Sequence, residues 1–208
     1  ATVLCHRETR LAIGGYLGHM WELYAMWTWL PAFLAASLAA RAAAGHEALP
    51  PHTVDLLAFG GIAAGGLGCV WGGWAAARMG YARVVTLAMA LSGACAAGIG
   101  LAYGAAPRLL VAVAWGWGFF VVADSPQFSA IVTEAAPAHA VGTALTLQTS
   151  LGFLLTMATI QLIPMIVAAI GWRWAFPVLA LGPALGIAAI ARLPRAQTSR
   201  SSAKNASP

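Results

Sequence analysis

Three ionisable side chains lie inside apolar stretches of the sequence. His19 and Glu22 are in GYLGHMWELYAMW, and Asp124 follows WGWGFFVVA. Ionisable groups in such surroundings are costly and mark either a functional site or a buried pair. Burial disfavours the charged form of a carboxylate, and an imidazole titrates near neutral pH already. The residues therefore favour reversible protonation, with mutual hydrogen bonding between helices as the structural alternative.

The composition places these residues in a membrane. Of the 208 residues, 61% are hydrophobic and 8% are charged, whereas about a quarter are charged in soluble domains. We expect an all-α membrane protein, because the strands of a membrane barrel would alternate polar and apolar residues, and these runs do not. Six apolar runs are each long enough to cross roughly 30 Å of hydrocarbon. They cover 11–40, 54–77, 84–103, 109–132, 141–170 and 174–190.

Basic residues fall mainly on one side of this arrangement. If the N-terminus is inside, 8 of the 11 Lys and Arg residues lie in inner segments. Cytoplasmic loops carry the excess of Lys and Arg. We therefore expect both termini in the cytoplasm and the chain in the plasma (inner) membrane. The net charge of +5 then reflects this topology and does not indicate nucleic-acid binding.

Glycine and proline predict how the helices pack and bend. In FGGIAAGGLGCVWGG, two pairs of glycines are spaced four residues apart, which predicts close packing of the second helix on a neighbour. These are Gly61 with Gly65 and Gly68 with Gly72. Pro31 and Pro126 weaken backbone hydrogen bonding and favour bending near the ionisable residues.

The turn between the second and third runs resembles a signature of the major facilitator superfamily. That family carries G-x-x-x-D-R-x-G-R-R between the second and third helices of each half. In GWAAARMGYAR, Ala77 and Tyr81 depart from the acidic position and one basic position. The residues that resemble the signature are Gly73, Arg78, Gly80 and Arg83. GWRWAF at 171–176 is also similar to the family's short outer loop before the last helix of a half.

The resemblance implies a fold and a function. The chain is similar to the C-terminal half of a twelve-helix fold, with two inverted three-helix repeats in 11–192. Residues 1–10 would end a central cytoplasmic linker, and 193–208 would form a disordered basic cytoplasmic tail. Because the chain begins with Ala and not Met, we expect an N-terminal six-helix half upstream. The implied function is secondary active transport of a small solute by alternating access, coupled to protons as a symporter or antiporter. A self-contained six-helix channel or membrane subunit is the alternative.

The candidate site follows from depth and repeat symmetry. At about 1.5 Å per residue, His19, Glu22 and Asp124 lie about 13–18 Å from the inner ends of their helices. In the family, the first helix of each repeat lines the central cavity, so we expect Glu22 and Asp124 to face a common space. Gln148 could bind a polar solute there or form a hydrogen bond between helices. The remaining candidates, for the cavity wall, are Met26, Trp29, Thr149 and Gly152.

No enzymatic motif accompanies these residues. His19-x-x-Glu22 supplies two metal ligands where a zinc site needs three or four, and neither HExxH nor GxSxG is present. Lys and Arg are absent at mid-membrane depth, which favours a neutral, cationic or amphipathic solute over an anion. We expect no enzymatic activity, no metal and no cofactor. The expected partners are the solute, protons, the lipid bilayer and the N-terminal half.

Overall fold

The long apolar runs form long helices. The computed structural model describes residues 2–50 and 52–194, and within this part of the chain it contains helices and turns but no strand. Six segments are long and apolar enough to cross a membrane, which confirms that expectation. The described chain thus has the makeup of a multi-pass membrane protein. Of the predicted tail, 195–208 lies outside the described residues, whereas Leu193 is buried against the bundle.

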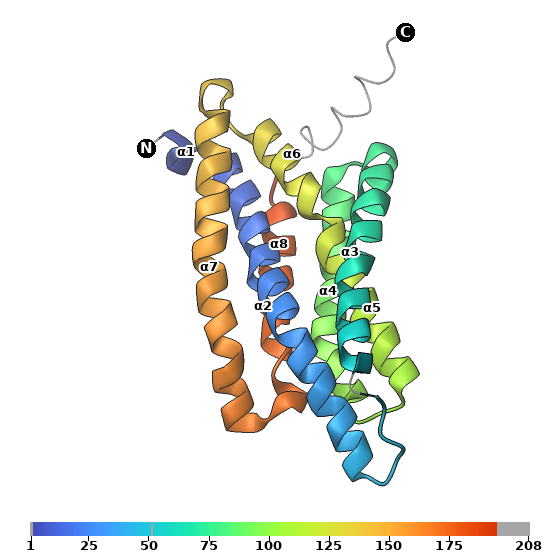
Figure 1. Cartoon of the computed structure of the whole chain (residues 1–208). Helices are drawn as coiled ribbons and strands as arrows, with labels where there is room; N and C mark the ends of the chain where they lie inside the picture. The colour runs from blue at the N-terminus through green and yellow to red at the C-terminus, as the bar shows by residue number, and fades with distance from the viewer. Residues whose placement is uncertain (1, 51, 195–208) are drawn as a thin grey trace.

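The α-helices are labelled as in Figure 1. They are α1 (Thr2–Cys5), α2 (Arg7–Ala43), α3 (His52–Met79), α4 (Tyr81–Gly98), α5 (Pro107–Ala123), α6 (Ser125–Ala135), α7 (Val141–Ile170) and α8 (Leu181–Ile190). The 37 residues of α2 extend for about 56 Å, well beyond a hydrocarbon layer of about 30 Å. Helical structure therefore reaches into the segment 1–10 that the sequence suggested as a linker.

α2 and α8 lie in the middle of the molecule in Figure 1. In Figure 1, α7 lies on one side of these two helices and α3 lies on the other, beside α4 and α5. The start of α2 and the end of α8 lie at the same end of the bundle (Figure 1). Each span reverses the direction of the chain, because the connections between neighbouring helices are short. After six spans the chain is therefore back at the end of the bundle where α2 begins.

The glycines of α3 lie against α5, as their spacing predicted. Gly61, Gly65, Gly68 and Gly72 are all buried. A Cβ atom at Gly68 or Gly72 would overlap a carbonyl oxygen of α5, and one at Gly118 of α5 would overlap the carbonyl oxygen of Gly61. The two backbones therefore approach each other more closely than any larger residue would permit.

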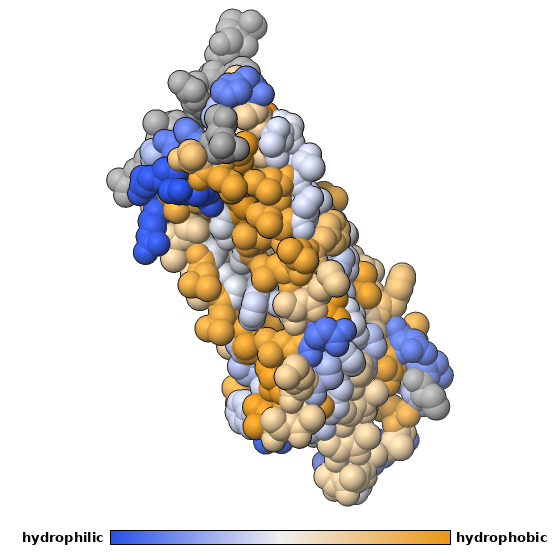
Figure 2. Space-filling model, turned by 90° about the vertical axis from the view of Figure 1, so that its left-hand side faces the viewer, coloured by the Kyte–Doolittle hydropathy of each residue, from blue (hydrophilic) through white to orange (hydrophobic). Residues whose placement is uncertain are grey.

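The outer face of α3 is apolar. Phe59, Leu67 and Val70 are 70%, 69% and 74% exposed, and a surface of this kind suits contact with lipid tails. Figure 2 shows another side of the molecule, where hydrophobic residues extend along the length and the largest hydrophilic cluster lies near one end.

The fourth apolar run forms one membrane span, Pro107–Ala135, with a turn inside it. α5 ends at Ala123 and α6 begins at Ser125, with Asp124 between them. Pro126 has no N–H to donate to the carbonyl of Val122, four residues earlier, so an unbroken helix would leave that oxygen without its usual donor. The thiol of Cys69 on α3 donates to this oxygen at 3.7 Å. The turn therefore lies two residues before Pro126, and the thiol of Cys69 supplies a donor to the oxygen of Val122.

The sixth run is also less regular than expected. Residues Trp172–Trp174 and Pro177–Ala180 form 3₁₀ turns, and only Leu181–Ile190 is α-helical. Pro177 and Pro183 both lack a backbone N–H, and each lies in the first turn of its helical segment, where that N–H would have no partner within the helix.

Candidate functional site

Glu22 is enclosed by three helices in the middle of the bundle. Its side chain on α2 is 1% exposed. Trp117 of α5 donates its indole N–H to Oε1 at 2.5 Å, and Ser92 of α4 donates its hydroxyl to Oε2 at 2.8 Å. Each carboxylate oxygen thus has one donor, and both donors are neutral.

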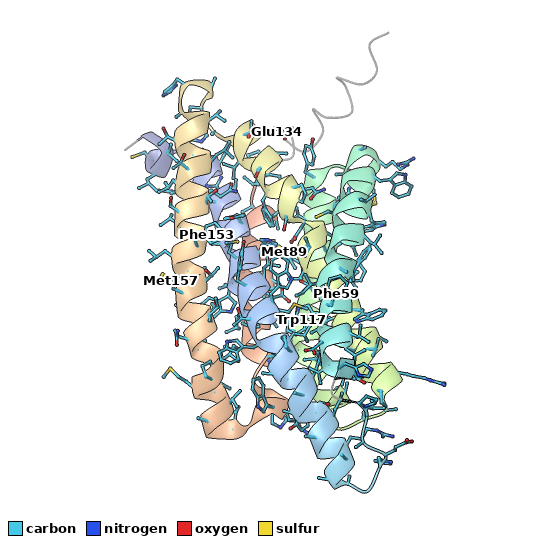
Figure 3. All side chains as sticks on the ribbon, viewed as in Figure 1. Phe59, Met89, Trp117, Glu134, Phe153 and Met157 are labelled. Atoms are coloured by element: carbon cyan, nitrogen blue, oxygen red, sulfur yellow. The ribbon has the colours of Figure 1, made fainter. Side chains whose placement is uncertain are left out.

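The neighbouring packing fixes these two donors. Trp117 is fully buried, and its ring meets Phe176 edge to face at a centroid distance of 5.1 Å. The Ser92 hydroxyl lies 3.3 Å from the carbonyl oxygen of Met89, one turn earlier in α4. In Figure 3, Trp117 and Met89 lie between the helices, whereas Met157 points away from the bundle. A buried indole N–H needs an acceptor, and Glu22 provides it.

We predict that Trp117→Phe destabilises the protein, because it removes the N–H while keeping an aromatic ring in the core. A hydrogen bond to a charged or strongly polar group contributes about 1.5–3 kcal/mol to the free energy of unfolding. Trp115→Phe is the matched control, since Trp115 is exposed and donates to the backbone oxygen of Leu57 at 3.0 Å. Thermal unfolding in detergent should show a clearly larger loss for Trp117→Phe, and equal losses would contradict the assigned role of this bond.

His19 and Asp124 form a second buried group beside the first. Nδ1 of His19 lies 3.0 Å from Oδ1 of Asp124, and Nε2 lies 3.0 Å from the hydroxyl of Ser125. Both His19 and Asp124 are buried. The first of these contacts brings the imidazole of His19 within ion-pair distance of the Asp124 carboxylate.

Glu22 and Asp124 therefore have different partners. His19 and Glu22 are three residues apart and lie on one side of α2. Through these two residues α2 contacts α4 and α5 at Glu22 and the α5–α6 break at His19. All three ionisable groups are buried inside the bundle and not on its outer surface.

The other candidate residues are dispersed. Gln148 and Gly152 are buried on α7, on the face toward α2, and Gly152 lies beside Tyr16. Thr149 is exposed and donates to its own helix at Leu145 O. On α2, Met26 is buried in the hydrophobic core, and Trp29 donates its indole N–H to Ile160 O at 2.8 Å. These residues lie on two helices, α2 and α7.

The loop that resembles the family signature lies at the end of α3. Gly80 has φ +83° and precedes α4, a conformation that favours glycine. Arg78 extends over the ring of Trp74 at 3.8 Å and donates to the backbone oxygen of Trp74. Gly73 and Arg83 are exposed.

Sequence reasoning missed the partners of the ionisable groups. Ser92 is a hydroxyl residue in the middle of an apolar run, at about the same depth as His19, and the depth argument used for the carboxylates would have identified it. Trp117 carries no comparable signal, because tryptophan in a membrane helix is usually explained by packing or by the interface. Among the described residues, no group of three or more His, Cys, Asp or Glu side chains could hold a metal ion.

Comparison of the chain with known protein families and with curated proteins finds no match.

Proposed function

We propose that this chain is the C-terminal six-helix half of a secondary active transporter, with Glu22 as the residue that couples solute movement to protons. The transporter works by alternating access, and the chain has both termini in the cytoplasm. The signature-like loop around Arg78 and Gly80 supports the major facilitator superfamily. His19, Asp124 and Gln148 belong to the same proposed region of the transport pathway.

The hydrogen bonds around the Glu22 carboxylate support the proposal. A serine hydroxyl can either donate or accept a hydrogen bond. When Glu22 is ionised, Ser92 donates to Oε2, as observed at 2.8 Å. When Glu22 is protonated, its O–H can donate to Ser92 Oγ while the serine hydroxyl turns to Met89 O, 3.3 Å away. Trp117 donates to Oε1 in both states, so the site accommodates either charge without leaving a group unpaired.

The burial of Glu22 in the membrane interior favours a change in its protonation during transport. An ionised carboxylate in the membrane interior is costly, and the neutral donors around Glu22 compensate only part of this cost. A conformational change that hydrates the site would favour ionisation, and closure would favour protonation. Protonation and conformation are then linked, which is the requirement for coupling.

Solute uptake into proteoliposomes tests the function class. The full-length protein is reconstituted, and uptake of a panel of radiolabelled neutral and cationic solutes is followed with and without an imposed pH gradient. We expect at least one solute to accumulate above its external concentration only when the gradient is present, and a protonophore to abolish this accumulation. Equilibration of solutes without any accumulation would instead favour the six-helix channel.

A further inference from the structure

Arginine side chains gather at one end of the bundle. They lie where α2 begins, where α3 meets α4 and where α8 ends, and Figure 1 shows these helix ends at the same end of the molecule. The residues are Arg7, Arg10, Arg78, Arg83 and Arg192, and all of them are exposed. The acidic residues of the described chain at this end are Glu8 and Glu134. This end of the bundle therefore carries an excess of positive charge.

Arg78 lies at the edge of the apolar part of α3. From Asp55 in the first turn to Arg78 in the last turn, α3 has no other charged residue. That stretch extends for about 35 Å along the helix axis, which is close to the hydrocarbon thickness of about 30 Å. Arg78 is therefore expected at the level where the lipid headgroups begin.

The guanidinium of Arg78 is held on the outer face of α3. It lies over the ring of Trp74 at 3.8 Å, and its Nη1 donates to the backbone oxygen of Trp74 at 3.2 Å. Trp74 is itself 55% exposed. A guanidinium has five N–H donors in a planar fork that matches the oxygen atoms of a phosphate. Because the bond to Trp74 uses Nη1 alone, the rest of the fork can bind an oxyanion from outside the bundle.

An apolar track continues from Trp74 along the same face of α3. Leu67 and Val70 are 69% and 74% exposed. Gly66 and Gly73 are exposed beside them, and a Cβ at either glycine would have no atom within 4 Å. Large apolar side chains beside open backbone form a surface on which an acyl chain can lie. A charged group that binds phosphate and a surface that suits a lipid chain thus follow each other on one helix face.

We propose that this end of α3 binds a phospholipid with an anionic headgroup, with the lipid phosphate on Arg78 and an acyl chain along Val70 and Leu67. Arg83, exposed in the first turn of α4 after the turn at Gly80, adds positive charge beside the headgroup. Anionic phospholipids attract basic residues next to the ends of membrane helices. A zwitterionic lipid has the same chains without the net charge, and inorganic phosphate has the charge without the chains, so the experiment separates the three.

Native mass spectrometry of the full-length protein tests this binding. The protein is presented in detergent micelles with equal amounts of dioleoylphosphatidylglycerol and dioleoylphosphatidylcholine, and the lipids that it retains are counted. We expect at least about tenfold more phosphatidylglycerol than phosphatidylcholine on the wild-type protein, and equal retention would overturn the proposal. Inorganic phosphate should not raise the unfolding temperature relative to chloride at equal ionic strength. A rise with phosphate that Arg78→Gln abolishes would assign the site to a soluble anion instead.

Arg78→Gln and Arg108→Gln form a matched pair, because both arginines are exposed and Arg108 lies in the first turn of α5, at the opposite end of the bundle. We expect Arg78→Gln to lower the ratio of retained phosphatidylglycerol to phosphatidylcholine at least about threefold. Arg108→Gln should leave this ratio unchanged. An unchanged ratio in Arg78→Gln, or an equal fall in Arg108→Gln, would overturn the proposal.

Trp74→Leu distinguishes a positioned guanidinium from a general effect of charge. It removes the ring under Arg78 and keeps every charge of the protein. We expect the ratio of the two retained lipids to fall at least about twofold, and a wild-type ratio would overturn the proposed geometry. Because lipid retention is measured without a solute or a pH gradient, its outcome is independent of proton coupling through Glu22.

Discussion

Glu22→Gln is expected to reduce proton-driven accumulation of solute at least about tenfold while leaving exchange of solute across the membrane intact. Glutamine has nearly the same shape as a protonated glutamic acid. Its Oε1 can accept from Trp117, and its amide can donate to Ser92, whose hydroxyl then turns to Met89 O. The variant therefore retains the bonds of the protonated state but cannot release a proton.

Two assays in proteoliposomes separate these effects. Accumulation is measured under an imposed pH gradient, and exchange is measured with solute on both sides and no gradient. Glu47→Gln is the control, since Glu47 is exposed in the turn between α2 and α3. It should behave as wild type in both assays. Accumulation equal to that of wild type in Glu22→Gln would contradict the coupling role of Glu22. Loss of both exchange and accumulation would mean that Glu22 supports the structure and does not couple solute to protons.

Gly118→Leu is expected to cause the largest loss of stability among single substitutions in the α3–α5 contact. A side chain at this position meets the backbone oxygen of Gly61 and not a movable side chain, so the two helices must separate. Overpacking of this kind costs about 3 kcal/mol of the free energy of unfolding. Separation would also widen the contact in which Cys69 donates to Val122 O at the helix break.

Gly116→Leu is the control on the same helix. A Cβ at Gly116 has no atom within 4 Å, so the added side chain meets open space. Thermal unfolding in detergent should show a large loss for Gly118→Leu and little change for Gly116→Leu. Similar stabilities for the two variants would mean that the close approach of α3 and α5 does not support the bundle.

Composition and spacing predicted the elements of this fold but not their irregularities. The six apolar runs and the glycine strip of α3 follow from hydropathy and from the four-residue spacing, which are local properties of the chain. The break at Asp124 was harder to predict, because a proline can kink a membrane helix without ending it. The contact of Cys69 with Val122 O is a tertiary contact that the sequence does not show.

The sequence selected ionisable and polar residues but not their contacts. Depth selected His19, Glu22 and Asp124, and the structure buries all three and brings His19 to 3.0 Å from Asp124. Helical periodicity identified a polar stripe on α7 but could not show which way it faces, and the structure turns Gln148 toward α2 while Thr149 is exposed. The partners of Glu22 come from α4 and α5, so only the tertiary structure reveals them.

The most direct test of the account is whether a solute gradient moves protons. Full-length protein is reconstituted into liposomes that contain a pH-sensitive dye, and an accumulated solute is added on one side without any imposed pH gradient. Coupling is reciprocal, so the internal pH should change with wild-type protein and remain constant with Glu22→Gln. A constant internal pH with wild-type protein, or the same change with Glu22→Gln, would contradict proton coupling through Glu22.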